Sequence, residues 1–406
     1  MPSLCFYFQV HQPVRLRRYT FFDIGTSAGY ADDSMNWDVL AKVASKCYLP
    51  ANKVMLDLIR AFKGDFRIAY SISGVALDQF QQFAPDVISS FQRLADTGCV
   101  EFLNETYHHS LAFVFSRQEF AEQVELHQRR ITGLFGRPAV TFRNTELIYR
   151  DDLAREVERL GYRVILAEGA DRILRRRSPN RIYQPAGCPN LRLLVKNYRL
   201  SDDIAFRFTQ RDGKGRPLTA ATFARRLHAL RRSAHTINLF MDYETFGEHH
   251  WAGTGIFQFL RELPGAVLAH PEFRFRTPAE AAGDHAPAGS LPVPEFLSWA
   301  DIERDLSAWL GNQMQRDAAE ALYALEPQVK ALRDPLVLAT WRQLQTSDHF
   351  YYMCTKHSGD GDVHQYFTPY PSPYDAYIHF MNVLSDFRAR LQAGTPGQPP
   401  PTENGV

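Results

Sequence analysis

Acidic, amide and imidazole side chains gather directly after four short apolar runs of the sequence. The runs end near residues 10, 103, 143 and 242. The polar residues at or after these ends are His11, Gln12, Asn104, Glu105, His108, His109, Arg143, Asn144, Glu146, Asp242, Glu244, Glu248, His249 and His250. Carboxyl groups brought together from separate strand ends can cleave a glycosidic bond, because one acid protonates the leaving oxygen while a second attacks the sugar or activates water.

Each candidate also has an ordinary structural interpretation when it is taken alone. Glu146 fits a surface acid paired with Arg143 or Arg150. Asp242 closes the apolar run INLFMD and fits the cap of a following helix. The functional interpretation is favoured because the same kinds of side chain, acids, amides or imidazoles, occur at all four predicted strand ends.

The elements that must position these residues alternate along the first two thirds of the chain. Short apolar segments predict strands at residues 4–10, 66–73, 100–103, 139–143, 164–167, 190–196 and 237–242. Helical periodicity lies between several of them, at residues 39–62, 76–96, 117–135, 151–160 and 221–232. Strands that are apolar throughout are typical of a parallel sheet covered on both faces. The pattern predicts an α/β barrel of about seven units, whose functional groups lie at the C-terminal ends of the strands.

The sequence changes character after residue 282. Residues 283–294 are rich in Pro, Gly and Ala, which is typical of a connection between domains. Helical patterns follow at residues 299–325, 335–345 and 374–391. We therefore expect a catalytic barrel over residues 1–282, a linker over 283–294 and an all-helical domain over 295–393. The low-complexity residues 394–406 are expected to be a disordered tail.

Charge and cysteine content narrow the class of partner. The 406 residues include 46 basic and 45 acidic side chains, for a formal net charge of +1, so neither nucleic acid nor an anionic membrane is expected as a partner. The five cysteines form no CxxC pair, which indicates free thiols and no zinc knuckle. The N-terminus lacks the pattern of a signal peptide, and no apolar stretch is long enough to span a membrane. We expect a cytoplasmic protein with an uncharged partner.

Five short motifs resemble those of glycoside hydrolase family 57, and specifically of its alpha-amylase-like members. They are HQP at residues 11–13, GCVEFLNETYHHSL at 98–111, FRNTELIYRDDLA at 142–154, MDYETFGEHHW at 241–251 and LQTSDHFYYM at 344–353. The third and fourth motifs, in this order and at the separation that these residue ranges give, are quite specific for the family. The resemblance extends from residue 4 to about residue 390.

The resemblance implies a fold and a mechanism. The fold is an irregular (β/α)7 barrel followed by a helical domain that completes the active-site cleft. The mechanism retains the configuration of the sugar, with Glu146 as the nucleophile and Asp242 as the general acid/base. The implied substrate is an alpha-1,4-glucan or maltooligosaccharide, and neither a metal nor another cofactor is implied.

The resemblance also implies a set of substrate-binding residues. Glu101 and His109 match sugar-binding positions of the second motif, His11 lies near the sugar that is attacked, and Asp348 is contributed by the helical domain. The whole expected set is His11, Gln12, Glu101, Tyr107, His109, Arg143, Glu244, His249, Trp251 and Asp348.

Three alternatives remain at this point. The same residues suit a 4-alpha-glucanotransferase or a glucan branching enzyme, in which a sugar hydroxyl replaces water. A metal-dependent polysaccharide deacetylase would use His11, His108, His109 and an acid as metal ligands. A non-catalytic glucan-binding protein would keep its effect when Glu146 is replaced.

The double acid at Asp202 and Asp203 has no role in these motifs. It lies in the sequence YRLSDDIAFRF, within a predicted loop of the barrel. Contact with substrate is compatible with this place, but the spacing assigns no function.

Overall fold

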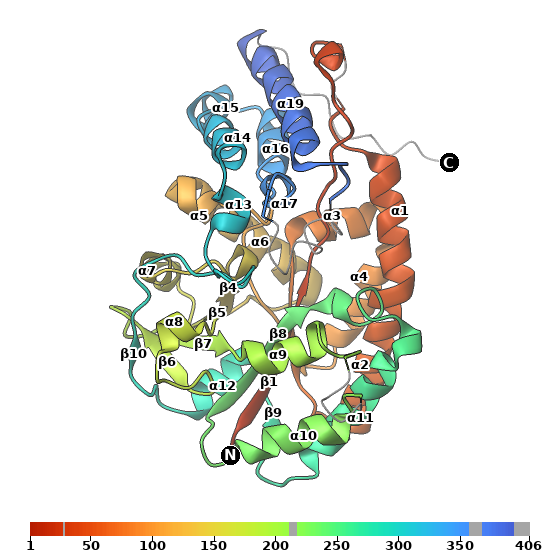
Figure 1. Ribbon diagram of the computed structural model, residues 1–406, viewed down its shortest axis with the longest axis vertical. Coiled ribbons are helices and arrows are strands. Elements are labelled where there is room, and N and C mark those ends of the chain that lie inside the picture. Colours follow the sequence, from red (N-terminus) through yellow and green to blue (C-terminus); the bar gives the residue numbers. More distant parts are fainter. Residues whose placement is uncertain (27–28, 211–216, 357–367, 394–406) are drawn as a thin grey trace.

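The computed structural model describes residues 1–26, 29–210, 217–356 and 368–393. Strands of the first three hundred residues form a barrel, and the helices of the later chain lie together beyond one end of it (Figure 1). The predicted tail, residues 394–406, lies outside the described residues.

Seven parallel strands build the barrel as two sheets. In the first, β1 (Ser3–Val10) lies between β2 (Ile68–Ile72) and β8 (Thr236–Asp242), and β3 (Val100–Phe102) extends the sheet beyond β2. The second contains β4 (Thr141–Arg143), β5 (Val164–Glu168) and β7 (Arg192–Lys196). These are the seven strands expected from the apolar runs, shifted by one or two residues at their ends.

Single backbone contacts join the two sheets at both seams. Asn104 forms an isolated parallel bridge with Phe142, which links β3 to β4. The N–H of Asn197 donates to the carbonyl of Asn238 at 2.9 Å, which links β7 to β8. Because neighbouring strands are parallel, the C-terminal ends of all seven meet at one end of the barrel.

Three short strands were not predicted. β6 (Ile182–Pro185) pairs antiparallel with β7, β9 (Arg274–Phe275) pairs with the start of β1, and β10 (Ser290–Leu291) pairs with β6. β10 lies inside the segment predicted as a linker. β9 and β10 have two residues each, which is too short to show a pattern in the sequence.

Helices surround the barrel strands and then form the later part of the chain (Figure 1). The barrel helices are α1 (Asp33–Val43), α2 (Leu49–Ala61), α3 (Gly74–Phe83), α4 (Pro85–Ala95), α5 (Ala112–Phe115), α6 (Arg117–Phe135), α7 (Asp151–Arg159), α8 (Asp171–Leu174), α9 (Tyr198–Ala205), α10 (Ala220–Ala229), α11 (Ile256–Leu268) and α12 (Pro278–Asp284). The later helices are α13 (Ser307–Leu310), α14 (Gln313–Tyr323), α15 (Glu326–Leu332), α16 (Pro335–Gln343), α17 (Asp348–Tyr351) and α19 (Pro373–Ala393).

Several predicted helices differ in extent from the observed ones. The predicted helix 39–62 is interrupted by a π-helical turn, η2 (Ala44–Tyr48). The predicted helix 76–96 is divided before Pro85, which lacks the N–H of a helix interior and begins α4 instead. The predicted helix 299–325 begins only at Ser307, since Asp301 and Arg304 have φ of 55° and 52°. α9 and α11 were not predicted, and α11 contains Pro264 in its interior.

Aromatic packing fixes the chain directly after β8. Tyr243 packs against Phe8 of β1 and Tyr70 of β2, with ring centroids 5.1 and 5.0 Å apart. Its hydroxyl donates to Oδ1 of Asn52 in α2 at 2.8 Å. The backbone that carries Asp242 is therefore anchored to two strands and a helix.

Candidate active site

A cavity of about 780 Å³ opens at the C-terminal ends of the barrel strands. It is lined from the barrel by residues that include Gln9, His11, Gln12, Glu146, Lys196, Asp202, Asp242, Glu244, His249 and Trp251. Trp299, Trp309, Ser347, Asp348, Tyr351 and Tyr352 line it from the chain after the barrel. The predicted catalytic acids thus share one cavity with the predicted residues of the first and fifth motifs.

Glu146 lies in η3 (Thr145–Leu147), immediately after β4, with a left-handed backbone at φ 56°. Its Oε1 accepts a hydrogen bond from Nε2 of His109 at 2.7 Å, and its Oε2 accepts one from the indole N–H of Trp299 at 2.7 Å. Burial alone would raise the pKa of Glu146, but these hydrogen bonds and the charges of His109 and Arg143 outweigh it, so the pKa is lowered. The carboxylate is held ionised and in one orientation.

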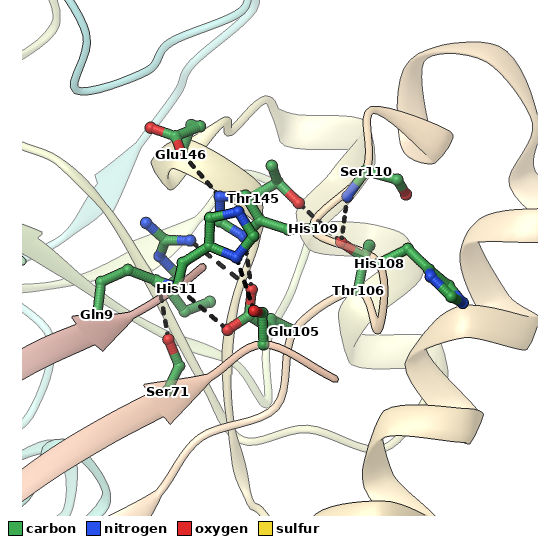
Figure 2. Close-up of polar contacts among 12 residues, drawn as sticks. Gln9, His11, Ser71, Glu105, Thr106, His108, His109, Ser110, Thr145 and Glu146 are labelled. Atoms are coloured by element: carbon green, nitrogen blue, oxygen red, sulfur yellow. Dashed lines mark hydrogen bonds and ion pairs between the residues drawn. The ribbon is translucent and has the colours of Figure 1, made fainter. Parts of the chain in front are cut away.

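His109 connects Glu146 to a second carboxylate, Glu105 (Figure 2). Its Nδ1 lies 2.9 Å from Oε2 of Glu105, and both residues are fully buried. Burial favours the neutral imidazole, yet the two carboxylates dominate and raise the pKa of His109 to about 9. The pKa of Glu105 falls to about 2, since its bond to His109 and the nearby cations outweigh its burial. Both imidazole nitrogens therefore donate, which gives a buried carboxylate–imidazolium–carboxylate row.

His11 stacks on this imidazolium. The two rings are 3.9 Å apart between centroids and inclined by 21°. Nε2 of His11 donates to Oδ2 of Asp348 at 2.9 Å, so Nδ1, 2.7 Å from Oγ of Ser73, accepts a hydrogen bond from that hydroxyl. Burial and the charge of His109 lower the pKa of His11. A neutral His11 thus joins the barrel strand β1 to α17 of the later chain.

Asp242 ends β8 and faces the same cavity. Burial and the negative charge of Glu146 raise its pKa to about 6, against the opposing charges of Arg143 and Lys196. Glu244, two residues on, accepts a hydrogen bond from the Tyr48 hydroxyl, and burial together with Asp242 raises its pKa to about 8. Two carboxyl groups of the cavity therefore favour opposite protonation states, with Glu146 ionised and Asp242 able to carry a proton.

Three further residues of the predicted binding set also line the cavity. Gln12 is buried and donates to the Tyr48 hydroxyl at 3.2 Å. His249 lies in the cavity wall, and burial lowers its pKa to about 4. Trp251 is 67% exposed at the rim, with Nζ of Lys46 lying 5.7 Å from its ring centroid.

Glu101, which was expected to bind substrate, is not among the residues that line this cavity. Its Oε1 accepts from the hydroxyl of Thr141, and its Oε2 accepts from the N–H of Ala279 at 2.9 Å. Glu105 holds the position beside His109 instead. The signal for Glu105 was present, because it precedes His109 by four residues in the same motif.

Tyr107 and Arg143 also lie outside the cavity wall. The Tyr107 hydroxyl donates to Asp78 at 2.7 Å. Arg143 is fully buried, with its guanidinium 4.9 Å from the ring centroid of Trp299. The charge of Arg143 acts to lower the pKa values of Glu146 and Asp242. We therefore revise its expected role from contact with substrate to an electrostatic effect on these two carboxyl groups.

His108 and His109 diverge although they are adjacent in the sequence. His108 points away from Glu146, while His109 points between the two carboxylates (Figure 2). The ligand set of the deacetylase alternative, which needs His11, His108 and His109 together, is therefore not assembled. Among the described residues, no group of three His, Cys, Asp or Glu side chains is arranged to hold a metal ion.

Trp299 is the main site residue that the sequence analysis missed. Trp299 lies in the sequence after the end of the barrel and belongs to none of the five motifs. Nothing in the sequence therefore connected it to Glu146. Its backbone N–H also donates to the carbonyl of Glu146 at 3.2 Å. The segment after the barrel therefore holds the candidate nucleophile through both its backbone and its side chain.

Comparisons with known proteins show the family of the chain. The family model described as glycosyl hydrolase family 57 matches residues 5–294. A protein of Methanocaldococcus jannaschii named "Putative alpha-amylase" is 43% identical over 397 residues, which cover 95% of this chain and 84% of that protein.

Solved structures of this kind share the fold at low sequence identity. A branching enzyme of the family from Thermococcus kodakaraensis superposes with a TM-score of 0.65 at 14% identity, over 100% of this chain and 98% of that one. The 4-alpha-glucanotransferase of Thermococcus litoralis gives 0.62 at 16% identity, over 86% of this chain and 56% of that one. An alpha-amylase of Thermotoga maritima gives 0.61 at 11% identity, over 97% and 94%.

The fold is an irregular α/β barrel with a helical C-terminal region, and the family match and the similar curated protein define a glycoside hydrolase. The chain belongs to glycosyl hydrolase family 57. This confirms the family and the fold class expected from the motifs. Among the described residues, no helix combines the length and the apolar character needed to cross a membrane.

Proposed function

We propose that this protein is a retaining hydrolase of alpha-1,4-glucans, with Glu146 as the nucleophile and Asp242 as the general acid/base. The observation that carries the proposal is the opposite tuning of two carboxyl groups in one cavity, because environments that push two pKa values apart identify the acid and the nucleophile. The alpha-amylase name of the 43% identical relative supports the substrate class.

In the first step, Oε of Glu146 attacks the anomeric carbon of the bound glucosyl unit. Protonated Asp242 transfers its proton to the glycosidic oxygen as the bond to the leaving sugar breaks. The products of this step are a covalent glucosyl ester on Glu146, an ionised Asp242 and a released sugar with a free hydroxyl.

In the second step, ionised Asp242 removes a proton from water, which attacks the anomeric carbon and displaces Glu146. The ester carries no charge, so the Coulombic contribution of Glu146 that raises the pKa of Asp242 is lost in the intermediate. The pKa of Asp242 then falls, which favours its second role as a base.

A trapping experiment with paired variants tests the proposal. Wild type, Glu146→Gln and Asp242→Asn are incubated with maltooligosaccharides, and products are read by chromatography. We expect loss of turnover in both variants with folding intact by circular dichroism. With 5-fluoro-α-glucosyl fluoride, mass spectrometry is expected to find the label on the peptide that contains Glu146. A label on another residue, or full turnover in either variant, contradicts the assignment.

The product balance separates hydrolysis from the transferase alternatives. Hydrolysis of maltooligosaccharides creates one new reducing end per bond cleaved, whereas a 4-alpha-glucanotransferase redistributes chain lengths without changing that number. A branching enzyme creates linkages that isoamylase removes. We expect reducing ends to increase with each turnover.

The helical region forms part of this proposed site. Trp309, Ser347, Asp348, Tyr351 and Tyr352 line the cavity from it, which supports the proposal that residues 295–393 complete the cleft of the barrel. The expected domain boundaries and the cytoplasmic location stay predictions.

A further inference from the structure

Four charged side chains form a cluster in one wall of the cavity, apart from the catalytic carboxyl groups. They come from the ends of β5 and β7, from α9 and from the segment after the barrel, and they are Glu168, Lys196, Asp202 and Arg304. Lys196, Asp202 and Arg304 line the cavity, and Glu168 lies fully buried behind them. The cluster contains two acids and two bases, so its formal charge is zero.

Lys196 lies at the centre of this cluster. Its Nζ is 3.3 Å from Oδ1 of Asp202 and 3.7 Å from Oε2 of Glu168, and its side chain is 7% exposed. The same Nζ lies 5.1 Å from the ring centroid of Trp299, the residue that donates to Glu146. Lys196 also acts on Asp242 electrostatically. The ammonium group therefore lies in the cavity wall close to Trp299 and near enough to Asp242 to affect its pKa.

The acids of the cluster have unused hydrogen-bonding capacity. Oδ1 of Asp202 and Oε2 of Glu168 are buried and have the Lys196 ammonium as their ionic partner, but neither forms a hydrogen bond of good geometry with the described residues. A carboxylate accepts several hydrogen bonds, so one ammonium shared between two acids leaves capacity for a further donor at Asp202, which lines the cavity. A ligand with neutral hydroxyl groups satisfies both sides, because each hydroxyl donates to a carboxylate and accepts from an ammonium.

The two adjacent aspartates of α9, Asp202 and Asp203, point in different directions. Asp202 faces the cavity, whereas Asp203 faces the surface, where its carboxylate pairs with Arg207 and Arg226 at 2.9 and 2.8 Å. Adjacent positions on a helix point in different directions, about 100° apart. The two aspartates therefore have different partners, and Asp203 serves as a matched control for Asp202.

We propose that Lys196 and Asp202 form a hydroxyl-binding subsite for the glucosyl unit that is transferred to Glu146. Asp202 accepts a hydrogen bond from one hydroxyl of that unit, and Lys196 donates to the neighbouring oxygen. Glu168 and Arg304 keep the pair in place from behind and from the side. This inference rests on the proposed function, since it concerns the same bound sugar.

Three variants test the subsite on maltotriose and maltopentaose. Asp202→Asn and Lys196→Met are each expected to lower kcat/KM by about 10-fold or more, as expected for a lost hydrogen bond to a charged group. Asp203→Asn is expected to stay within about twofold of wild type. Melting temperatures of all three variants are measured to confirm that the fold is kept. Values of kcat/KM for Asp202→Asn and Lys196→Met as high as that of Asp203→Asn would overturn the subsite.

Deoxy substrates separate a sugar contact from a structural effect. α-Glucosyl fluoride and its 2-, 3-, 4- and 6-deoxy analogues are compared in wild type and Asp202→Asn. One analogue lacks the hydroxyl that Asp202 binds, and wild type is expected to lose activity on that analogue. Asp202→Asn already lacks the contact, so removing the same hydroxyl is expected to lower its activity little further. A variant that is impaired equally on every analogue overturns the inference.

The Glu146→Gln variant distinguishes a failure of the proposed subsite from a failure of the proposed function. If Glu146→Gln is inactive and Asp202→Asn is unimpaired, only the subsite fails. If Glu146→Gln turns over normally, the proposed function fails. Maltotriose binding to wild type, Asp202→Asn and Asp203→Asn by calorimetry then decides the subsite without turnover, and equal affinities, or no binding at all, overturn it.

Discussion

Glu146 and Asp242 differ in the groups that surround their carboxyl oxygens. Each oxygen of Glu146 faces an N–H donor, from His109 on one side and Trp299 on the other. Asp242 is buried beside the charge of Glu146, and its pKa rises to about 6. At the scale of single residues, the chemistry of the cleft therefore depends on donors placed at one carboxyl group and on burial at the other.

The first prediction is the pH dependence of kcat/KM on maltooligosaccharides. The acid must be protonated and the nucleophile ionised, so the rate is expected to fall as pH rises above about 6, the pKa of Asp242. On the acid side it falls only below the ordinary range of a glutamate, since the pKa of Glu146 is lowered. Initial rates from pH 3 to 9 measure both limits. A rate that stays constant up to pH 8 would contradict the role of Asp242.

The second prediction concerns Trp299→Phe, which keeps a ring but removes the donor to Glu146. A hydrogen bond to a charged group is worth about 1.5–3 kcal/mol, so kcat/KM is expected to fall by about 10-fold or more. The pKa of Glu146 rises when the donor is lost, and the acid limit of the pH profile moves to higher pH. Trp341→Phe is the control, because its indole donates to the carbonyl of Leu322 in the helical region, outside the cavity. An acid limit that moves equally in both variants would contradict the specific role.

The residues of the site were predictable where a motif lies at the end of a strand. Glu146, Asp242 and His11 lie in the cavity as expected, since each is at or shortly after the C-terminal end of a strand. Glu101 was assigned to substrate binding by its match to the second motif, and a motif match alone does not say which way the side chain of a strand residue points. Trp299 was not predictable, because its contact with Glu146 depends on the path of a segment that has no regular structure.

At the scale of elements, a π-helical turn shapes the loop after Asp242. The turn η2 packs against the loop that begins with η4 (Tyr243–Thr245). Sγ of Cys47 donates to the carbonyl of Tyr243 at 3.3 Å, and the Tyr48 hydroxyl donates to Glu244. The extra residue of a π turn redirects the side chains around it, and such turns are frequent at functional sites.

The third prediction is that Gly247→Ala separates this turn from the loop. A Cβ at Gly247 would lie 1.9 Å from the carbonyl oxygen of Lys46, and the backbone has φ of 119°. We expect a loss of at least about 2 kcal/mol of folding free energy, from overpacking and backbone strain together, with lower kcat. Urea unfolding and steady-state kinetics measure the two effects.

Gly253→Ala is the control for that substitution. Gly253 lies on η5 (Ala252–Thr254) of the same loop region, and nothing lies within 4 Å of the place of an added Cβ. The folding free energy of the Gly253→Ala variant is expected to stay within about 0.5 kcal/mol of that of wild type. A Gly247→Ala protein as stable as this control would show that the turn and the loop move apart without cost.

Elements were predictable in proportion to their length and apolar content. The seven barrel strands were expected because each lies in a short, mostly apolar run of the sequence, and α6 matches its expected residues 117–135. α11 was missed because Pro264 lies within it, yet packing of its apolar face keeps the helix. The chain from 299 to 306 was expected to be helical, but Trp299 and Arg304 are directed to partners across the cavity wall instead.

At the scale of the whole molecule, the contacts between the later helices and the N-terminal chain include two that differ in their relation to the cavity. One is the hydrogen bond between His11 and Asp348 at the cavity. The other lies beyond it, where Asp386 of α19 accepts from the N–H of Gly25 and from the Tyr30 hydroxyl, both at 2.6 Å. Figure 1 shows the chain after β1 extending alongside α19. The first contact belongs to the site, and the second holds the helical region in place without touching it.

The last prediction compares removal of these two contacts. Asp348→Ala leaves the buried His11 without its acceptor, and because His11 stacks on His109, kcat/KM is expected to fall by about 10-fold, the equivalent of about 1.4 kcal/mol. Asp386→Ala leaves Gly25 and Tyr30 unpaired and is expected to cost about 1–3 kcal/mol of folding free energy, while kcat/KM at a temperature where the variant is folded stays near wild type.

The pH dependence of stability separates these two variants further. His11 and His109 outweigh burial and hold the pKa of Asp348 well below its usual range. A carboxyl group of this kind contributes stability that is present above its unfolded pKa, about 3.9, and is lost as pH falls through the folded value. The stability difference between wild type and Asp348→Ala, measured by urea unfolding, is therefore expected to be full at pH 6 and to shrink below pH 4.

The kinetics of the two variants test whether the contact at the cavity has a specific role. Equal losses of kcat/KM in Asp348→Ala and Asp386→Ala would mean that the helical region supports the cleft only by general rigidity. No loss of kcat/KM in either variant would mean that the barrel completes the site alone.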